Sequence, residues 1–148
     1  MTIHFRLISE FITIGTRSFE FDDTAILNPV GGNPLIMGEF LELSDAYKAK
    51  RGSADPGAVP SYAYFAEQGA YDVQGLGKGP LLFMHQYEAE TKIFDATDLA
   101  YGVKLEVAPV TYGTLTRRGL QKLTTGYPIG HVTRITGNGW LRFKCYNM

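Results

Sequence analysis

The stretch Gly137-Asn138-Gly139-Trp140-Leu141-Arg142-Phe143-Lys144-Cys145-Tyr146 decides the fold. Its second part alternates large apolar residues with polar ones, which is the pattern of a half-buried strand. A similar strand is predicted just before it, from Ile129 to Ile135. The Gly-Asn-Gly sequence between them supplies the backbone freedom that a tight turn needs, so the two strands are predicted to form a β-hairpin.

Outward from this hairpin, the same pattern recurs along the chain. Further strands are predicted at 5–14, 18–22, 37–43, 61–67, 71–74, 81–88, 92–94 and 103–112. Their spacing of roughly 8 to 12 residues, with Gly and Pro between them, favours an all-β fold, a small barrel or sandwich, over any alternation of strands and helices. Residues 44–51 fit either a helical turn capped by Ser44 or an extension of the preceding strand. Residues 52–60 and 75–80 are predicted to be loops.

The segment 28–34 contains two Asn-Pro steps and a Gly pair, which marks a boundary. We therefore predict an extended N-terminal arm at residues 1–32 and a β-barrel-like body at 33–148. Two interpretations of the arm remain open: it reaches a neighbouring molecule, or it supplies two ordinary strands to the core of its own domain. The arm is too apolar for a solvated tail, and the residues expected to be docked on something are Phe11, Ile12, Ile14, Phe19 and Phe21.

Composition narrows the classes of function. The 148 residues carry a net charge of -1 and only 20% charged residues, and the basic residues are scattered, so the sequence argues against nucleic-acid binding. The single cysteine, Cys145, allows no intrachain disulfide and no zinc site built on paired cysteines. An inert position within a strand is expected for it, either packed inside the domain or exposed at a sheet edge. No secretory signal and no run of about 18 apolar residues is found, so no membrane association is expected.

Motifs that carry chemistry are weak, and no cofactor, metal or catalytic residue is predicted. Gly75-Leu76-Gly77-Lys78-Gly79 lacks the spacing of a phosphate-binding loop and is followed by a strand. The three histidines have no ligand spacing around them. The pair Arg117-Arg118 is predicted to lie on an exposed loop, where it would either bind carboxylates of a partner or be solvated.

The order of several short segments resembles the capsid decoration, or cement, proteins of tailed bacteriophages. The segments are 32–35, 38–43, 70–74, 102–107, 118–120, 130–132 and 141–143. The resemblance implies a structural protein, not an enzyme, that binds the outside of the phage head as a trimer or clustered copies. It implies the major capsid protein as partner, the outer surface of the virion as location after synthesis in the host cytoplasm, and bridging of shell subunits as function. The arm could then add a strand to a neighbour's sheet. Partner contacts are expected at Phe11, Ile12, Ile14, Phe19, Phe21, Arg117 and Arg118.

Three alternatives compete with this interpretation. Another virion component, such as a tail-tube or head-completion protein, also suits a small β-domain. A carbohydrate-binding barrel could stack a sugar on aromatic residues such as Trp140 and on Tyr62, Tyr64 and Tyr71. An enzyme that uses paired carboxylates, Glu88 with Glu90 or Asp95 with Asp98, is the least favoured because no partner group accompanies them.

Overall fold

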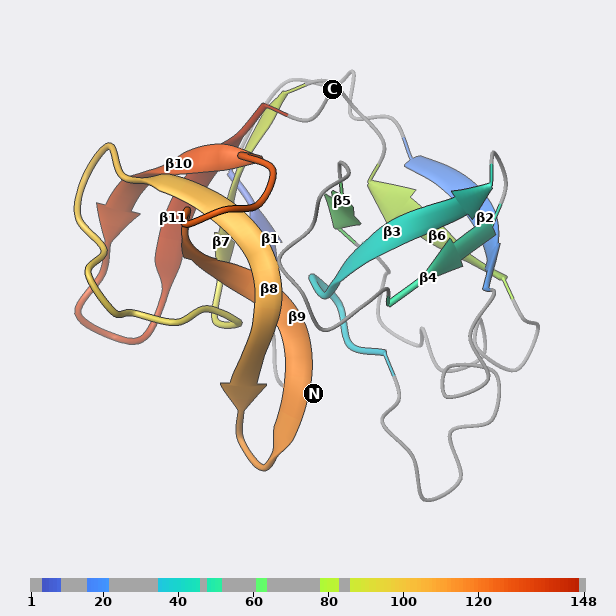
Figure 1. Cartoon of the computed structure of the whole chain (residues 1–148), viewed down its shortest axis with the longest axis horizontal. Coiled ribbons are helices and arrows are strands. Elements are labelled where there is room, and N and C mark those ends of the chain that lie inside the picture. Colours follow the sequence, from blue (N-terminus) through green and yellow to red (C-terminus); the bar gives the residue numbers. More distant parts are fainter. Residues whose placement is uncertain are drawn as a thin grey trace.

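The computed structural model describes residues 4–8, 16–21, 35–45, 48–51, 61–63, 78–82 and 86–146. Regular structure within these ranges consists of strands alone, which confirms the all-β prediction (Figure 1). The strands form a six-stranded and a five-stranded sheet. No helix in the described part of the chain has the length and apolar character that a membrane span requires.

The six-stranded sheet is antiparallel throughout and strongly curled, like half of a barrel (Figure 1). Its order is β1 (Phe5–Leu7), β7 (Tyr87–Thr91), β11 (Leu141–Cys145), β10 (Gly130–Ile135), β8 (Lys104–Tyr112) and β9 (Leu115–Lys122). The predicted C-terminal hairpin is confirmed as β10 and β11, with a register shift between Val132 and Arg134. The longest pairing joins β8 to β9.

The second sheet has the order β5 (Ser61–Ala63), β3 (Phe40–Asp45), β4 (Lys48–Lys50), β2 (Thr16–Phe21) and β6 (Lys78–Leu82). Strands β2 and β4 run parallel, and the other pairs are antiparallel. Residues 44–51 were expected to form a helical turn or to extend the preceding strand; Ser44 and Asp45 do extend β3, whereas Lys48–Lys50 form a separate strand, β4, that pairs antiparallel with it. The loop predicted for residues 75–80 is wrong at its end, where Lys78 already begins β6.

Strand β3 lies between two apolar cores. Phe40 belongs to the core of the six-stranded sheet, where its ring lies 6.3 Å from that of Phe143. The next residue, Leu41, points the other way and packs in the core of the five-stranded sheet with Phe19 and Leu81. Phe40 and Leu41 are both fully buried. Burying both faces of one strand is the arrangement that joins the two sheets into one body.

The described parts of segment 1–32 are strands of these two sheets. Strand β1 pairs with β7, and Phe5 lies in the first core. Strand β2 pairs with β4 and β6, and Phe19 and Phe21 lie in the second core. For these strands the structure therefore matches the second interpretation of the arm, in which it supplies the domain's own core. Phe11, Ile12 and Ile14 lie outside the described residues.

Two glycines of the resemblance pattern allow close approach of the backbone. Gly38, in the turn before β3, has a φ of 91°, and a Cβ there would lie 2.4 Å from the Cβ of Phe5. A Cβ on Gly130 would lie 2.0 Å from the carbonyl oxygen of Lys144 across the β10–β11 hairpin. A side chain at either position would push neighbouring strands apart. Both positions therefore require glycine for the strands to pack as they do.

Candidate functional site

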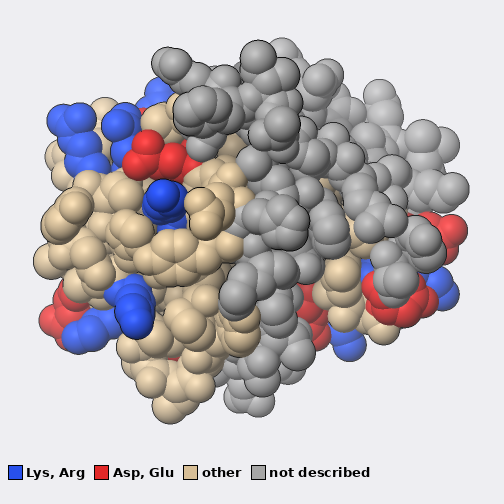
Figure 2. Space-filling view, turned by 90° about the horizontal axis from the view of Figure 1, so that it is seen from above, with Lys and Arg blue, Asp and Glu red and all other residues tan. Residues whose placement is uncertain are grey.

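Four charged side chains lie in one row on the outer face of the six-stranded sheet, the face turned away from its core. The register places Arg6 of β1 opposite Glu90 of β7, Glu90 opposite Arg142 of β11, and Arg142 opposite Arg134 of β10. Directly opposed residues of neighbouring strands point to the same face. Figure 2 shows basic and acidic side chains at the surface of the half of the molecule that contains the six-stranded sheet. We call Arg6, Glu90, Arg142 and Arg134 the charged row.

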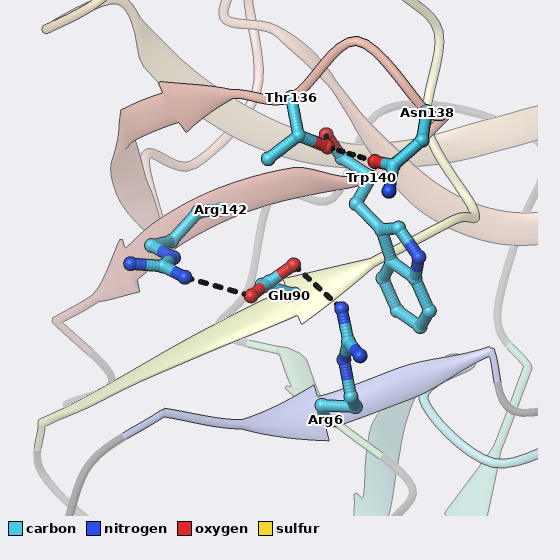
Figure 3. Close-up of polar contacts among 6 residues, drawn as sticks. All are labelled: Arg6, Glu90, Thr136, Asn138, Trp140 and Arg142. Carbon is cyan, nitrogen blue, oxygen red and sulfur yellow. Dashed lines mark hydrogen bonds and ion pairs between the residues drawn. The ribbon is translucent and has the colours of Figure 1, made fainter.

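Glu90 is the centre of the row. Its two carboxylate oxygens accept from different arginines, Oε1 from Nη2 of Arg142 at 2.9 Å and Oε2 from Nη2 of Arg6 at 3.0 Å (Figure 3). The Glu90 side chain is only 6% exposed, whereas those of Arg6 and Arg142 are 48% and 29% exposed. Burial raises the pKa of Glu90, but the hydrogen bonds from Arg142 and Arg6 outweigh it and hold the pKa below its ordinary value. The carboxylate therefore stays ionised at neutral pH.

The indole of Trp140 fixes the position of Arg6. The Arg6 guanidinium lies over the ring at 4.1 Å from its centroid, and Nζ of Lys92 lies 5.0 Å from the same centroid. A cation over an indole is attracted by the negative face of the ring. Trp140 is itself only 7% exposed. The ring is therefore a support for the arginine, which is a different role from the sugar-stacking platform considered from the sequence.

An open cleft of about 480 Å³ lies beside the row. Arg6 and Glu90 line one side of it, and the other side is formed by Arg134 and the turn that follows it, residues 135–138. The turn is held by Thr136, whose hydroxyl lies 2.9 Å from the Trp140 carbonyl and 2.6 Å from Oδ1 of Asn138 (Figure 3). The cleft thus combines N–H donors of arginines with a carboxylate already committed to ion pairs. Such a set of groups is suited to bind an anion.

A second charged cluster is buried where the two sheets meet. Glu39 is completely buried, and its carboxylate accepts from Nε of Arg51 at 2.6 Å and from Nη1 of Arg117 at 3.1 Å. The Arg117 side chain is 7% exposed and that of Arg51 is 13% exposed. We call these three residues the inter-sheet cluster. It joins the residue before β3 and the residue after β4 to strand β9 of the other sheet, so its role is to connect the sheets.

The sequence-based prediction for Arg117 and Arg118 is wrong in its premise. Both residues lie within β9 and are 6% and 4% exposed, so they are not on an exposed loop. Burial lowers the pKa of Arg118, and the carboxylates of Glu42 and Glu39 act in the opposite direction. The charged pair looked like a turn because the acidic partner of Arg117, Glu39, is 78 residues away in the chain.

Phe19 and Phe21 are interior residues as well, 1% and 4% exposed in the second core, as expected where the arm supplies the core of its own domain. Of the partner contacts expected from the sequence, the four that the structure describes are therefore interior residues. Phe11, Ile12 and Ile14 are not among the described residues. The structure brings none of the described four into the charged row.

The other acidic residues considered for catalysis have structural roles in the described part of the chain. Glu88 and Glu90 do share a face, as expected for one strand, but each lies opposite a basic residue of β11, Lys144 and Arg142. Asp95 caps a turn by accepting from the amide of Thr97 at 2.9 Å, which lowers the pKa of its carboxyl. Within the described ranges, no three His, Cys, Asp or Glu residues gather as a metal site would require.

The histidines that the structure describes pair with tyrosines. Nδ1 of His4 lies 2.6 Å from the hydroxyl of Tyr112, and the His131 ring is hydrogen-bonded to Tyr146. Burial is the first cause that lowers the pKa of His4, and the charges of Arg117 and Lys92 act in the same direction. Cys145 is buried, so of its two expected positions the packed one is correct. The two pairs thus connect His4 to Tyr112 at the end of β8, and His131 of β10 to Tyr146, which follows β11.

A buried carboxylate organises the loop after β9. Glu106 is fully buried and accepts from the amides of Thr124, Thr125 and Gly126 at 2.7, 3.2 and 3.0 Å, and from Nε2 of Gln121 at 2.9 Å. Burial raises the pKa of Glu106, but these hydrogen bonds together outweigh it and lower the pKa. The carboxylate takes the place of a backbone partner for three consecutive amides, so it fixes the loop on the outer face of β8.

Comparison with known proteins adds no relative to this description. No protein-family model matches the chain, and neither a curated protein nor a solved structure matches it. The charged row and its cleft therefore rest on the geometry of this chain alone.

Sequence reasoning missed the charged row, although part of its signal was present. Alternation puts Trp140, Arg142 and Lys144 on one face of the last strand. Alternation within a strand does not show which strands are neighbours. Strands β1 and β11 both pair with β7, and this pairing brings Arg6 and Arg142 to the same carboxylate.

Proposed function

We propose that this chain is a structural protein that works by binding other protein subunits, and specifically that it decorates and stabilises a bacteriophage capsid from outside. Its partner in this proposal is the major capsid protein, which it would bridge as a trimer or as clustered copies. The specific role follows from the resemblance in strand and turn positions. It includes no catalytic step, because the proposed task is to resist separation of shell subunits.

The observation that carries the proposal is the charged row. Its four side chains project from adjacent strands of one sheet, so their spacing is set by backbone hydrogen bonds. Groups held on strands keep their geometry better than groups on loops. Partly exposed arginines next to an aromatic ring are also typical of protein-binding surfaces. The inter-sheet cluster supports the same role, because it ties both sheets into a body that could transmit force.

The carbohydrate-binding alternative is less well supported. Among the four aromatic residues considered for sugar stacking, Trp140 is the one whose side chain the structure describes, and its ring is 7% exposed with Arg6 over it. A sugar would have to displace the guanidinium to stack there. The alternative of a tail or head-completion component differs from decoration in copy number, and it is separated by the experiment below.

The test is to purify virus particles from the source system and to quantify this chain against the major capsid protein by mass spectrometry. A ratio near one to one is the expected result. A few copies per particle would replace decoration with a tail or vertex role, and absence from particles would refute the virion proposal. Light scattering of the purified chain gives its mass independently, and a trimer is expected.

A further inference from the structure

We infer that the cleft beside the charged row binds a carboxylate that a partner protein presents, either an Asp or Glu side chain or a chain end. The inference rests on the proposed function for the class of partner, and it adds the site and the chemistry of recognition. The volume of the cleft, about 480 Å³, lies within the range of roughly 300–1,000 Å³ that small ligand sites span. A segment of an acidic loop would therefore fit.

The first argument is the number of donors that remain for a ligand. A guanidinium has five N–H donors. Among the described residues, Arg6 gives one hydrogen bond, to Glu90, and Arg134 gives none, although both line the cleft. The Nε of Arg142 is buried and also has no acceptor among the residues that the structure describes. Two planar guanidinium groups with spare donors match the two oxygens of a carboxylate.

The second argument is the balance of charge. Arg6, Arg142 and Arg134 contribute three positive charges to the charged row and Glu90 contributes one negative charge, which leaves two positive charges in excess. This excess favours an anion in the cleft. The anions that a partner protein presents are carboxylates, so a carboxylate is the ligand that the proposed class of partner supplies.

The third argument is a repulsion within the row. Arg134 and Arg142 are directly opposite each other on β10 and β11. Like charges directly opposite each other on neighbouring strands destabilise a sheet. Glu90 lies on the far side of Arg142, so it offsets only part of this repulsion. An anion bound beside Arg134 supplies the missing negative charge.

Trp140 provides the assay, because it is the single tryptophan of the chain and lies under Arg6. The full-length protein is titrated at constant ionic strength with a blocked five-residue peptide that contains three glutamates. The matched peptide contains three glutamines, and inorganic phosphate serves as a third probe. Fluorescence follows Trp140, and proton-nitrogen NMR spectra follow its indole N–H and the arginine side chains.

The expected result is a saturable response to the glutamate peptide with a dissociation constant of about 1 mM or below, and no saturable response to the glutamine peptide or to phosphate. Arg134→Gln should weaken binding about tenfold, as loss of a charge-assisted hydrogen bond does. Lys122→Gln, which removes an exposed charge from the opposite edge strand of the sheet, should leave binding unchanged.

Three outcomes would overturn the inference: no response by either method, a phosphate response equal to that of the peptide, or unchanged peptide affinity in Arg134→Gln. Arg134 is exposed, so its substitution should not unfold the protein, and a thermal melt checks this. The titration needs no virus particle. If the chain binds the peptide but is absent from particles, the carboxylate site stands and the capsid role is refuted. If the chain is present in particles but does not bind the peptide, the capsid role stands and the carboxylate site is refuted.

Discussion

Replacing Glu39 by Gln tests whether the inter-sheet cluster stabilises the junction between the sheets. The substitution keeps the shape of the side chain and removes its charge. Glu39 is completely buried and accepts from both Arg51 and Arg117. In the variant, each guanidinium would face a neutral amide, and one half of that amide is itself a donor.

The size of the effect follows from how well each arginine can reach water. Arg51 directly follows β4 and is 13% exposed, so part of its charge can be hydrated, whereas Arg117 is 7% exposed and is held within β9. Removing one partner of a buried ion pair costs about 3–5 kcal/mol. For a chain of this length, the midpoint of thermal unfolding should then fall by roughly 6–20 °C.

The measurement is chemical unfolding of both proteins in urea, followed by circular dichroism, with a thermal melt beside it. The matched control is Lys50→Met, which removes the pair between Lys50 and Glu42. In that pair the atoms are 3.9 Å apart and the lysine side chain is 44% exposed. Exposed pairs contribute at most about 1 kcal/mol, so this variant should unfold close to the wild-type midpoint.

One result would refute the reasoning about the cluster. If Glu39→Gln lost less than about 1 kcal/mol while its denaturant slope stayed unchanged, the buried charges would not depend on each other. A matching loss in the Lys50→Met control would show a general effect of charge instead.

Other substitutions test packing and the carboxylates. Phe40→Ala should cost about 3–5 kcal/mol in urea unfolding, because the ring is fully buried in the first core. Gly130→Ala should lower stability by about 1–3 kcal/mol, since its Cβ would lie 2.0 Å from a carbonyl oxygen across the hairpin. The pKa values of Glu90 and Glu106 are both lowered in the folded chain. The stability that these two carboxylates contribute is therefore fully present at pH values above the ordinary pKa of 4.5 and is lost as the pH falls through the folded pKa. At pH values below about 4.5, the protein should therefore unfold at lower urea concentrations than at neutral pH. Glu106→Gln should flatten that dependence; an unchanged pH profile would argue against the assigned hydrogen bonds.

The parts of the fold that could be predicted from the sequence are those that depend on local pattern. The β10–β11 hairpin follows from alternation around Gly137-Asn138-Gly139, and both predictions about that hairpin, strands and turn, are confirmed. Strand β9 was missed because Arg117 and Arg118 put two charges in its centre. A strand of this kind is stable only when a distant carboxylate pairs with it, and no local pattern contains that information.

The candidate site could be predicted even less, for a topological reason. Charged residues on alternate positions identify an outer face, but the charged row needs the strand order β1, β7, β11 and β10. That order joins residues 6, 90, 142 and 134, and such pairings across long stretches of chain follow from the global arrangement of strands. The two interpretations of the arm stayed open for a related reason, since a strand that belongs to a second sheet, such as the strand with Phe19 and Phe21, resembles a free arm when the sheet is not known.

The buried charge of Glu39 and the apolar residues of β3 specify the same register. Phe40 and Leu41 are both buried, one in each core, and Glu39 and Glu42 flank them. A slip of one residue changes the face on which each side chain lies, so it would put a glutamate at one of the two core positions. The same slip would carry the Glu39 carboxylate to the opposite face of the strand and away from Arg117. Fixing register is the best-attested use of buried polar groups, and here the inter-sheet cluster forms only in the alignment of β3 that also fills both cores.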